Sequence, residues 1–98
     1  MPQIAHLIWA DAAREDIIRL RAFISKHHPE AARRAAETIL KSTSVLLKFP
    51  AIGRPVEDME GFRDLYIPFG QHGYVLRYLL EHHEVVVLRV WHGRETRE

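Results

Sequence analysis

The chain is 98 residues long, with 47% hydrophobic and 28% charged residues, and this size predicts one compact domain spanning residues 1–98. It contains no cysteine, which excludes disulfides and thiolate chemistry and fits a cytoplasmic protein. The formal net charge of +1 argues against a protein that binds nucleic acid mainly through phosphates. The apolar stretch near the N-terminus is too short for a secretory signal, and no window reaches transmembrane length, so we expect no membrane partner.

The small net charge hides an uneven distribution. Residues 1–50 hold 8 Lys/Arg against 5 Asp/Glu, a balance of +3, whereas residues 51–98 hold 6 against 8, a balance of −2. Of the 14 basic residues, 11 are arginine, whose planar guanidinium pairs well with carboxylates and phosphates. Two interpretations remain open: ordinary surface ion pairs, or recognition of an anionic group on a partner.

The first quarter of the chain predicts a strand followed by a helix. Residues 4–9 (IAHLIW) form a short apolar run typical of a strand. Asp11 is placed to cap a helix that runs to about His27. Glu15 and Asp16 are favourable near the positive end of that helix. Its apolar residues fall on one stripe, at Ala13, Ile17, Leu20 and Ile24.

A second helix follows after a short break. Pro29 suits the first turn of a helix, and Pro50 ends the helical pattern. The apolar residues at helical spacing between them are Ala32, Ala36, Ile39, Leu46 and Phe49. The two helices therefore predict a helical hairpin. Residues 51–61 (AIGRPVEDMEG) have the glycine, proline and acidic content of an irregular connection.

The last third of the chain predicts three strands. They are residues 62–69 (FRDLYIPF), 74–80 (YVLRYLL) and 84–91 (EVVVLRVW), and a tight turn near His82 and His83 joins the last two. The element order is therefore β-α-α-β-β-β. It predicts an α+β fold in which the helical hairpin packs on a small, mainly antiparallel sheet.

The register of the last two strands decides which side chains share a face. A two-residue turn places Arg77 opposite Leu88, and by the same register Arg89 lies opposite Leu76. One face would then carry Val75, Leu79, Val86, Leu88 and Val90 around Arg77, and the other Tyr74, Leu76, Tyr78, Val85, Val87 and Trp91 around Arg89. Both faces are apolar, whereas one helical hairpin covers one side. We expect a partner to cover the remaining side; the alternative is that the hairpin and residues 51–61 wrap further around the sheet.

Four short motifs occur in a specific order along the chain. They are P-x-x-G-R at residues 50–54, G-F-R-x-L at 61–65, G-Y-x-x-x-Y at 73–78 and V-L-R-V-x-H-G-R at 87–94. Each motif alone is weak, but their order resembles the RelE/ParE toxin superfamily of bacterial toxin–antitoxin modules. The resemblance is strongest to the ParE, or plasmid-stabilisation, branch and covers nearly the full chain.

This resemblance implies a toxin that a cognate antitoxin neutralises, in a hetero-oligomer of the two proteins. Its mechanism depends on the branch. RelE-like members cut messenger RNA in the ribosome, whereas ParE-like members inhibit DNA gyrase by protein contact.

The residues that RelE-like nucleases use are mostly missing from this chain. RNA cleavage through the 2′-hydroxyl needs a base, an acid and cations around the phosphorane. The chain has Tyr66 and Pro68 where two nuclease lysines would lie, and Val75 where an arginine would lie. Only Arg94 plainly matches. The leading hypothesis is therefore inhibition of gyrase by binding, without a cofactor or a metal.

Two other hypotheses remain open. The first is a ribosome-dependent mRNA endonuclease whose catalytic residues are Arg77, His92 and Arg94. The second is a degenerate, non-toxic relative kept as a binding module.

The sequence also divides the candidate residues into two groups. Those predicted to bind the target are Arg77, Trp91, His92 and Arg94, and those predicted to be structural are Arg54, Arg63, Arg89 and Tyr74. We expect Arg89 to pair with an acidic residue or to cap carbonyls beneath the sheet. Arg54 and Arg63 either pin residues 51–61 to the sheet or, for one of them, reach the target. The adjacent histidine pairs at 27–28 and 82–83 lack the further ligands that a metal site needs.

Overall fold

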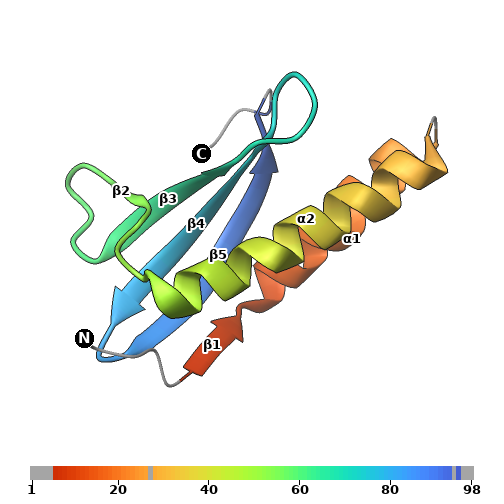
Figure 1. Cartoon of the computed structure of the whole chain (residues 1–98). Helices are drawn as coiled ribbons and strands as arrows, with labels where there is room; N and C mark the ends of the chain where they lie inside the picture. Colours follow the sequence, from red (N-terminus) through yellow and green to blue (C-terminus); the bar gives the residue numbers. More distant parts are fainter. Residues whose placement is uncertain (1–5, 27, 94, 96–98) are drawn as a thin grey trace.

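The computed structural model describes residues 6–26, 28–93 and 95 of the chain. Its elements, in chain order, are β1 (His6–Trp9), α1 (Asp11–Ser25), α2 (Pro29–Lys48), β2 (Arg54–Pro55), β3 (Phe62–Ile67), β4 (Tyr74–Glu81) and β5 (Glu84–His92). This order confirms the predicted α+β fold and adds the short strand β2 inside the segment predicted to be irregular. Figure 1 shows the two helices lying together along one face of the sheet.

The sheet is mainly antiparallel, with the strand order β1-β5-β4-β3-β2. Strand β1 runs parallel to β5, and the other neighbouring strands pair antiparallel. The first and last strands of the chain are therefore neighbours. Strand β1 covers only the first part of β5, because its last residue, Trp9, pairs with Val87.

Helix α1 begins directly where strand β1 stops. The amide of Ala10 still donates to the carbonyl oxygen of Val87 in the sheet, at 2.9 Å. Ala10 is therefore the N-cap residue, without a side-chain cap, and the prediction that Asp11 caps the helix is wrong. Asp11 is instead the first helical residue, where the positive end of the helix dipole favours its charge. The helix ends at Ser25, and the predicted end near His27 lies outside the described residues.

Helix α2 has the predicted start and end. Pro29 occupies the first turn, where its missing N–H is no loss. The helix ends at Lys48, and Phe49 leaves the helical conformation because a residue before proline is disfavoured in it. In the described part of the chain, neither helix is long and apolar enough to cross a membrane.

The core lies between the helices and the inner face of the sheet. Its buried side chains, each at most 4% exposed, include Leu20, Ile39, Leu46, Ile67, Tyr74, Leu76, Tyr78, Val85, Val87 and Val90. Their burial removes apolar surface from water, which supplies the main driving force for packing the hairpin on the sheet.

The pairing of β4 with β5 differs from the predicted register. It follows the prediction from the turn as far as the pair Tyr78 and Val87. A register shift next to that pair leaves Leu88 without a partner in β4, as in a β-bulge. Arg77 therefore pairs with Arg89. The prediction that Arg77 lies opposite Leu88 is wrong because one extra residue shifts every later pair.

The bulge also exchanges the faces of the residues that follow it. Side chains alternate with a period of two, so one inserted residue moves them to the opposite side. Val90 is buried opposite Leu76 on the helix side, although the sequence predicts it beside Arg77. Arg89 and Trp91 share the other face with Arg77, whereas the sequence predicts them on the opposite face.

We call the side of the sheet that the helices do not cover the open face. Its centre is polar, because the bulge brings Arg77 and Arg89 together there. The aliphatic residues that remain on it, Val75, Leu79, Val86 and Leu88, are half-buried. The expectation of a purely apolar face around one arginine is therefore wrong.

The tight turn between β4 and β5 lies where the sequence predicts it. His82 and His83 have φ angles of 47° and 69°, both in the left-handed region. Positive φ at both central residues is typical of a type I′ turn, which suits the twist of a hairpin. Residues other than glycine and asparagine adopt this conformation at a cost.

Candidate functional site

The centre of the open face is a row of three charged side chains on adjacent strands. Asp64 of β3 lies beside Arg77 of β4, which lies beside Arg89 of β5. Arg77 donates two hydrogen bonds to Asp64, from Nε to Oδ1 at 2.8 Å and from Nη2 to Oδ2 at 2.9 Å. Hydrogen bonding to Asp64 stabilises the guanidinium and raises the pKa of Arg77 above its ordinary value. The charge of Arg77 is thus already neutralised within the chain.

Trp91 lies against both guanidinium groups of this row. The Cζ atoms of Arg77 and Arg89 are each 5.3 Å from the centre of the tryptophan ring, within the range of a cation–π contact. Trp91 is only 4% exposed. We call Arg77, Arg89 and Trp91 the arginine–tryptophan cluster, in which the ring is covered and the arginines form the accessible part.

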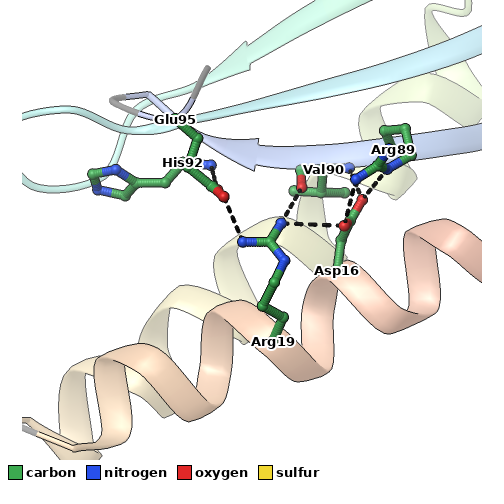
Figure 2. Close-up of polar contacts among 6 residues, drawn as sticks. All are labelled: Asp16, Arg19, Arg89, Val90, His92 and Glu95. Atoms are coloured by element: carbon green, nitrogen blue, oxygen red, sulfur yellow. Dashed lines mark hydrogen bonds and ion pairs between the residues drawn. The ribbon is translucent and has the colours of Figure 1, made fainter. Parts of the chain in front are cut away.

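Asp16 of α1 is the partner of Arg89, as Figure 2 shows. Its carboxylate accepts from Arg89 Nε at 2.7 Å and Nη2 at 3.1 Å, and from the backbone amide of Val90 at 2.8 Å. Arg19, one turn along α1, donates a further bond at 3.1 Å. Asp16 is only 3% exposed, so its negative charge depends on these contacts.

The pKa of the Asp16 carboxyl reflects two opposing effects. Burial alone would raise it, because a desolvated carboxylate is unfavourable. The hydrogen bonds from Arg89, Val90 and Arg19 outweigh burial, and the pKa lies below its ordinary value. Asp16 is therefore a charged structural group.

Arg89 meets the prediction that it pairs with an acidic residue. The contact forms at the edge of β5. Because β1 ends opposite Val87, the edge of β5 is uncovered at Arg89, and the guanidinium reaches Asp16 of α1 there. Bonding to Asp16 raises the pKa of Arg89 above its ordinary value.

His92 is not part of the arginine–tryptophan cluster. It follows Trp91 directly in β5, so its side chain lies on the helix side of the sheet. Its ring contacts Tyr74 and His72, with ring centres 5.6 Å and 5.7 Å away. Of the four residues predicted to bind the target, Arg77 and Trp91 are thus together, His92 is on the other face, and Arg94 lies outside the described residues.

Arg63 and Tyr78 tie the connection after α2 to the sheet. Arg63 donates to the carbonyl oxygens of Ala51 and Gly53, at 3.0 Å and 2.7 Å. The buried hydroxyl of Tyr78 donates to the carbonyl of Pro50 at 2.6 Å and accepts from the amide of Gly53 at 2.9 Å. A Cβ atom on residue 53 would lie 2.7 Å from the Tyr78 ring, so this close approach requires glycine.

The other two residues predicted to be structural, Tyr74 and Arg54, differ in burial. Tyr74 is 2% exposed and belongs to the core. Burial raises the pKa of its hydroxyl, with the charge of Glu95 as a second cause, so it remains a neutral phenol at neutral pH. Arg54 lies in β2 and is exposed, and its guanidinium makes no ion pair with any residue of the described ranges. It does not pin the loop as Arg63 does.

Four residues of the site, Asp16, Arg19, Asp64 and Glu95, are not among those predicted from the sequence. A signal for Asp16 exists, because it lies three residues after Ala13 and four before Leu20, on the buried stripe of α1. A carboxylate on such a stripe needs a cationic partner. Asp64 and Glu95 carry no comparable local signal, since their charged partners, Arg77 and Arg19, are distant in sequence.

A hollow on the open face lies beside the charged row. It has a volume of about 650 Å³ and is lined by Ile52, Arg54, Asp64, Leu65, Tyr66 and Val75. Tyr66 is 57% exposed there, at a position where a nuclease lysine would be expected. Among the described residues, no group of three or more His, Asp or Glu side chains could hold a metal ion.

The helical hairpin on this five-stranded sheet also occurs in a solved structure from a toxin–antitoxin system. A structure titled "Chromosomal ParDE TA system from P. aeruginosa" superposes with a TM-score of 0.75, covering 91% of this chain and 96% of that chain at 22% identity. At this identity the likeness supports the fold alone. The fold is thus one that occurs in a toxin–antitoxin system.

Sequence comparisons identify the family. Two curated proteins of Caulobacter vibrioides, "Toxin RelE3" and "Toxin RelE1", are each 38% identical to this chain over 85 residues. The match covers 87% of this chain, and 90% and 89% of the two relatives. The sequence model described as "ParE toxin of type II toxin-antitoxin system, parDE" matches residues 7–97, and the chain belongs to this family. It is a toxin of the type II toxin–antitoxin class.

Proposed function

We propose that this toxin inhibits DNA gyrase by direct binding and that a cognate antitoxin neutralises it. The proposal rests on one observation: both arginines at the centre of the open face already form ion pairs within the chain. Arg77 is bound by Asp64 and Arg89 by Asp16, so neither guanidinium is free to stabilise the extra charge of a phosphorane.

The geometry of the alternative catalytic set also supports binding over cleavage. A general acid or base must lie within hydrogen-bonding reach of the reacting atoms, together with the cations. His92 packs against Tyr74 on the helix side, whereas Arg77 packs against Trp91 on the open face. These two groups do not converge on one phosphate. The neutral residues Tyr66 and Val75 supply no replacement charge on the open face.

The open face is suited to binding a protein target. Exposed tyrosine and arginine are the residue types that most often dominate protein–protein interfaces. Tyr66 and Arg54 flank the hollow on the open face, next to the arginines of the arginine–tryptophan cluster. We therefore add Tyr66 and Arg54 to Arg77 as candidate contacts with the target. Trp91 acts beneath them as the support on which the guanidinium of Arg77 rests.

The second candidate function is ribosome-dependent cleavage of messenger RNA by Arg77, His92 and Arg94. The names of the two relatives from Caulobacter vibrioides, both RelE toxins, favour it. A third candidate is a non-toxic binding module. The ion pairs Arg77–Asp64 and Arg89–Asp16 are compatible with protein binding, both for a gyrase inhibitor and for a non-toxic binding module.

The antitoxin would find its surface on the helices. Large apolar side chains are exposed there, including Ile18 at 69%, Phe23 at 68% and Leu40 at 52%. Trp9, Arg14, Ile17, Ile18 and Leu40 line a hollow of about 320 Å³. Exposed apolar surface of this kind marks an interaction site. We propose that an antitoxin segment covers it and becomes ordered as it binds.

The experiment that tests the proposed function is tightly controlled expression in bacterial cells. Incorporation of labelled thymidine and labelled amino acids is measured in the first minutes after induction. Gyrase inhibition predicts that DNA synthesis stops first. If protein synthesis stopped first and His92→Ala abolished the effect, the ribosomal candidate would replace it. Unimpaired synthesis of both would favour the non-toxic module.

A further inference from the structure

The charged row on the open face continues onto a fourth strand. Arg54 of β2 pairs with Asp64 of β3 in the sheet, so the two side chains lie on the same face. Figure 1 shows β2, β3, β4 and β5 side by side in this order. The row therefore runs from Arg54 through Asp64 and Arg77 to Arg89.

One positive charge of this row stays uncompensated. Asp64 binds Arg77 with both of its carboxylate oxygens, and Asp16 binds Arg89 in the same way. Among the described residues, three arginines of the row thus meet two carboxylates, and the arginine left over is Arg54. Because Arg54 is also exposed, it can bind an anionic group without giving up an ion pair of the described chain.

The hollow on the open face places apolar side chains beside this charge. Arg54 and Asp64 contribute its charged lining, and the other lining residues are Ile52, Leu65, Tyr66 and Val75. Ile52 and Tyr66 are 52% and 57% exposed, so their apolar surface is available to a ligand. A ligand that fits the hollow combines one negative charge with apolar surface.

We propose that the hollow binds an acidic segment of the protein target, with an aspartate or glutamate carboxylate on Arg54 and a neighbouring apolar side chain against Ile52 and Tyr66. This inference rests on the proposed function, because it names the chemistry of the same target surface. A carboxylate can accept two parallel hydrogen bonds from a guanidinium, which fixes its orientation. Burial of the apolar side chain against the exposed wall adds affinity.

The same charges disfavour a nucleic acid in the hollow. A nucleic-acid strand carries a phosphate at every nucleotide, and its affinity depends on several cations that neutralise them. The row offers one uncompensated charge, because Asp64 already neutralises Arg77 and Asp16 neutralises Arg89. A single carboxylate next to an apolar side chain is the anion that this pattern fits.

The first test uses probes that do not depend on the identity of the target. They are acetyl-Glu-Leu-amide, its neutral counterpart acetyl-Gln-Leu-amide, and hexauridylate as a short RNA, each titrated into the whole chain and followed by NMR. The acidic dipeptide should shift the methyl signals of Ile52, Leu65 and Val75, with an affinity at least about tenfold above that of the neutral dipeptide. In Arg54→Gln this preference should disappear.

The second test measures inhibition of purified gyrase by the whole chain and its variants. Arg54→Gln should need about tenfold more protein for half-inhibition, and Arg54→Glu about a hundredfold more, because it adds repulsion to the loss of attraction. Arg54→Lys should retain most of the inhibition. The matched control is Arg34→Glu, which reverses another exposed arginine, on α2, and should inhibit like the wild type.

Two further measurements separate charge from apolar contact and from folding. Added salt should weaken inhibition by the wild type more than inhibition by Arg54→Gln, since the charged contact is screened. Ile52→Ser should weaken inhibition while keeping the salt dependence of the wild type. Unfolding midpoint and affinity for the antitoxin should stay near wild type in all Arg54 variants, because Arg54 is exposed.

Four results would overturn the proposal. They are tighter binding of hexauridylate than of the acidic dipeptide in the hollow, equal or absent shifts with the two dipeptides, full inhibition of gyrase by Arg54→Glu, and a parallel loss of antitoxin affinity in Arg54→Glu. The first would assign the hollow to RNA and the last to the antitoxin. Failure of the proposed function looks different: the wild-type chain would leave gyrase active, while the acidic dipeptide still bound the hollow through Arg54.

Discussion

Asp16 is the residue on which the C-terminal strand depends most. It is nearly fully buried, and four donors from Arg19, Arg89 and the Val90 backbone converge on it. A buried charge is stable only while its partners are present, so removing one partner leaves the other with an uncompensated cost. The pair of Asp16 with Arg89 should therefore behave differently from an ordinary surface ion pair.

Replacing Arg89 by alanine should destabilise the fold by about 2 kcal/mol, because Asp16 would lose two hydrogen bonds and its main counter-charge. The matched change Arg33→Ala breaks an exposed pair on α2 and should cost about 0.5 kcal/mol or less. Urea unfolding of both variants measures the difference. Equal costs for the two variants would show that the contact with Asp16 is dispensable.

The depressed pKa of Asp16 predicts how stability changes with acidity. A carboxyl whose pKa is lower in the folded state stabilises the fold fully above its unfolded value of about 4, and this contribution is lost as pH falls through the lower folded value. Wild-type protein should therefore lose stability below about pH 4 more steeply than Asp16→Asn. Urea midpoints measured across this range give the two slopes, and parallel curves would contradict the assignment.

At the scale of elements, most of the fold can be predicted from the sequence because each signal is local. Helical spacing, Pro29 and Pro50 are enough to locate the hairpin, and period-two patterns locate the strands. The β-bulge at Leu88 has no such signal. Its position follows from packing Val87 and Val90 against the helices on one side of the sheet, and the candidate site depends on it.

That dependence explains why the sequence predicts the residues of the site better than their arrangement. Arg77, Arg89 and Trp91 can be singled out from composition and motif, but their faces are assigned by counting from the turn. One extra residue reverses the assignment for Arg89 and Trp91. The partners Asp64 and Asp16 come from other elements and are visible only after folding.

Substitutions in the turn between β4 and β5 should increase the stability of the protein. His82 and His83 both adopt positive φ, which asparagine and glycine tolerate better than histidine. The double change of His82→Asn and His83→Gly should therefore stabilise the protein by about 1 kcal/mol. An increase in the urea midpoint without a change in slope is the expected result. A decrease would mean that the histidine side chains make stabilising contacts of their own.

At the scale of the whole molecule, the two faces present different surfaces. The hairpin exposes apolar side chains such as Ile18 and Phe23, and the open face presents arginines whose charges are satisfied internally. The first surface suits an antitoxin segment, and the second suits a protein target. We therefore expect a toxin that acts by contact with a protein target.

The most direct measurement of this claim is DNA supercoiling by purified gyrase, titrated with the purified chain. Binding-based inhibition predicts that supercoiling falls as the chain is added and returns when the cognate antitoxin is supplied in excess. Gyrase that remains fully active at concentrations of the chain at which messenger RNA on ribosomes is cut would contradict the account.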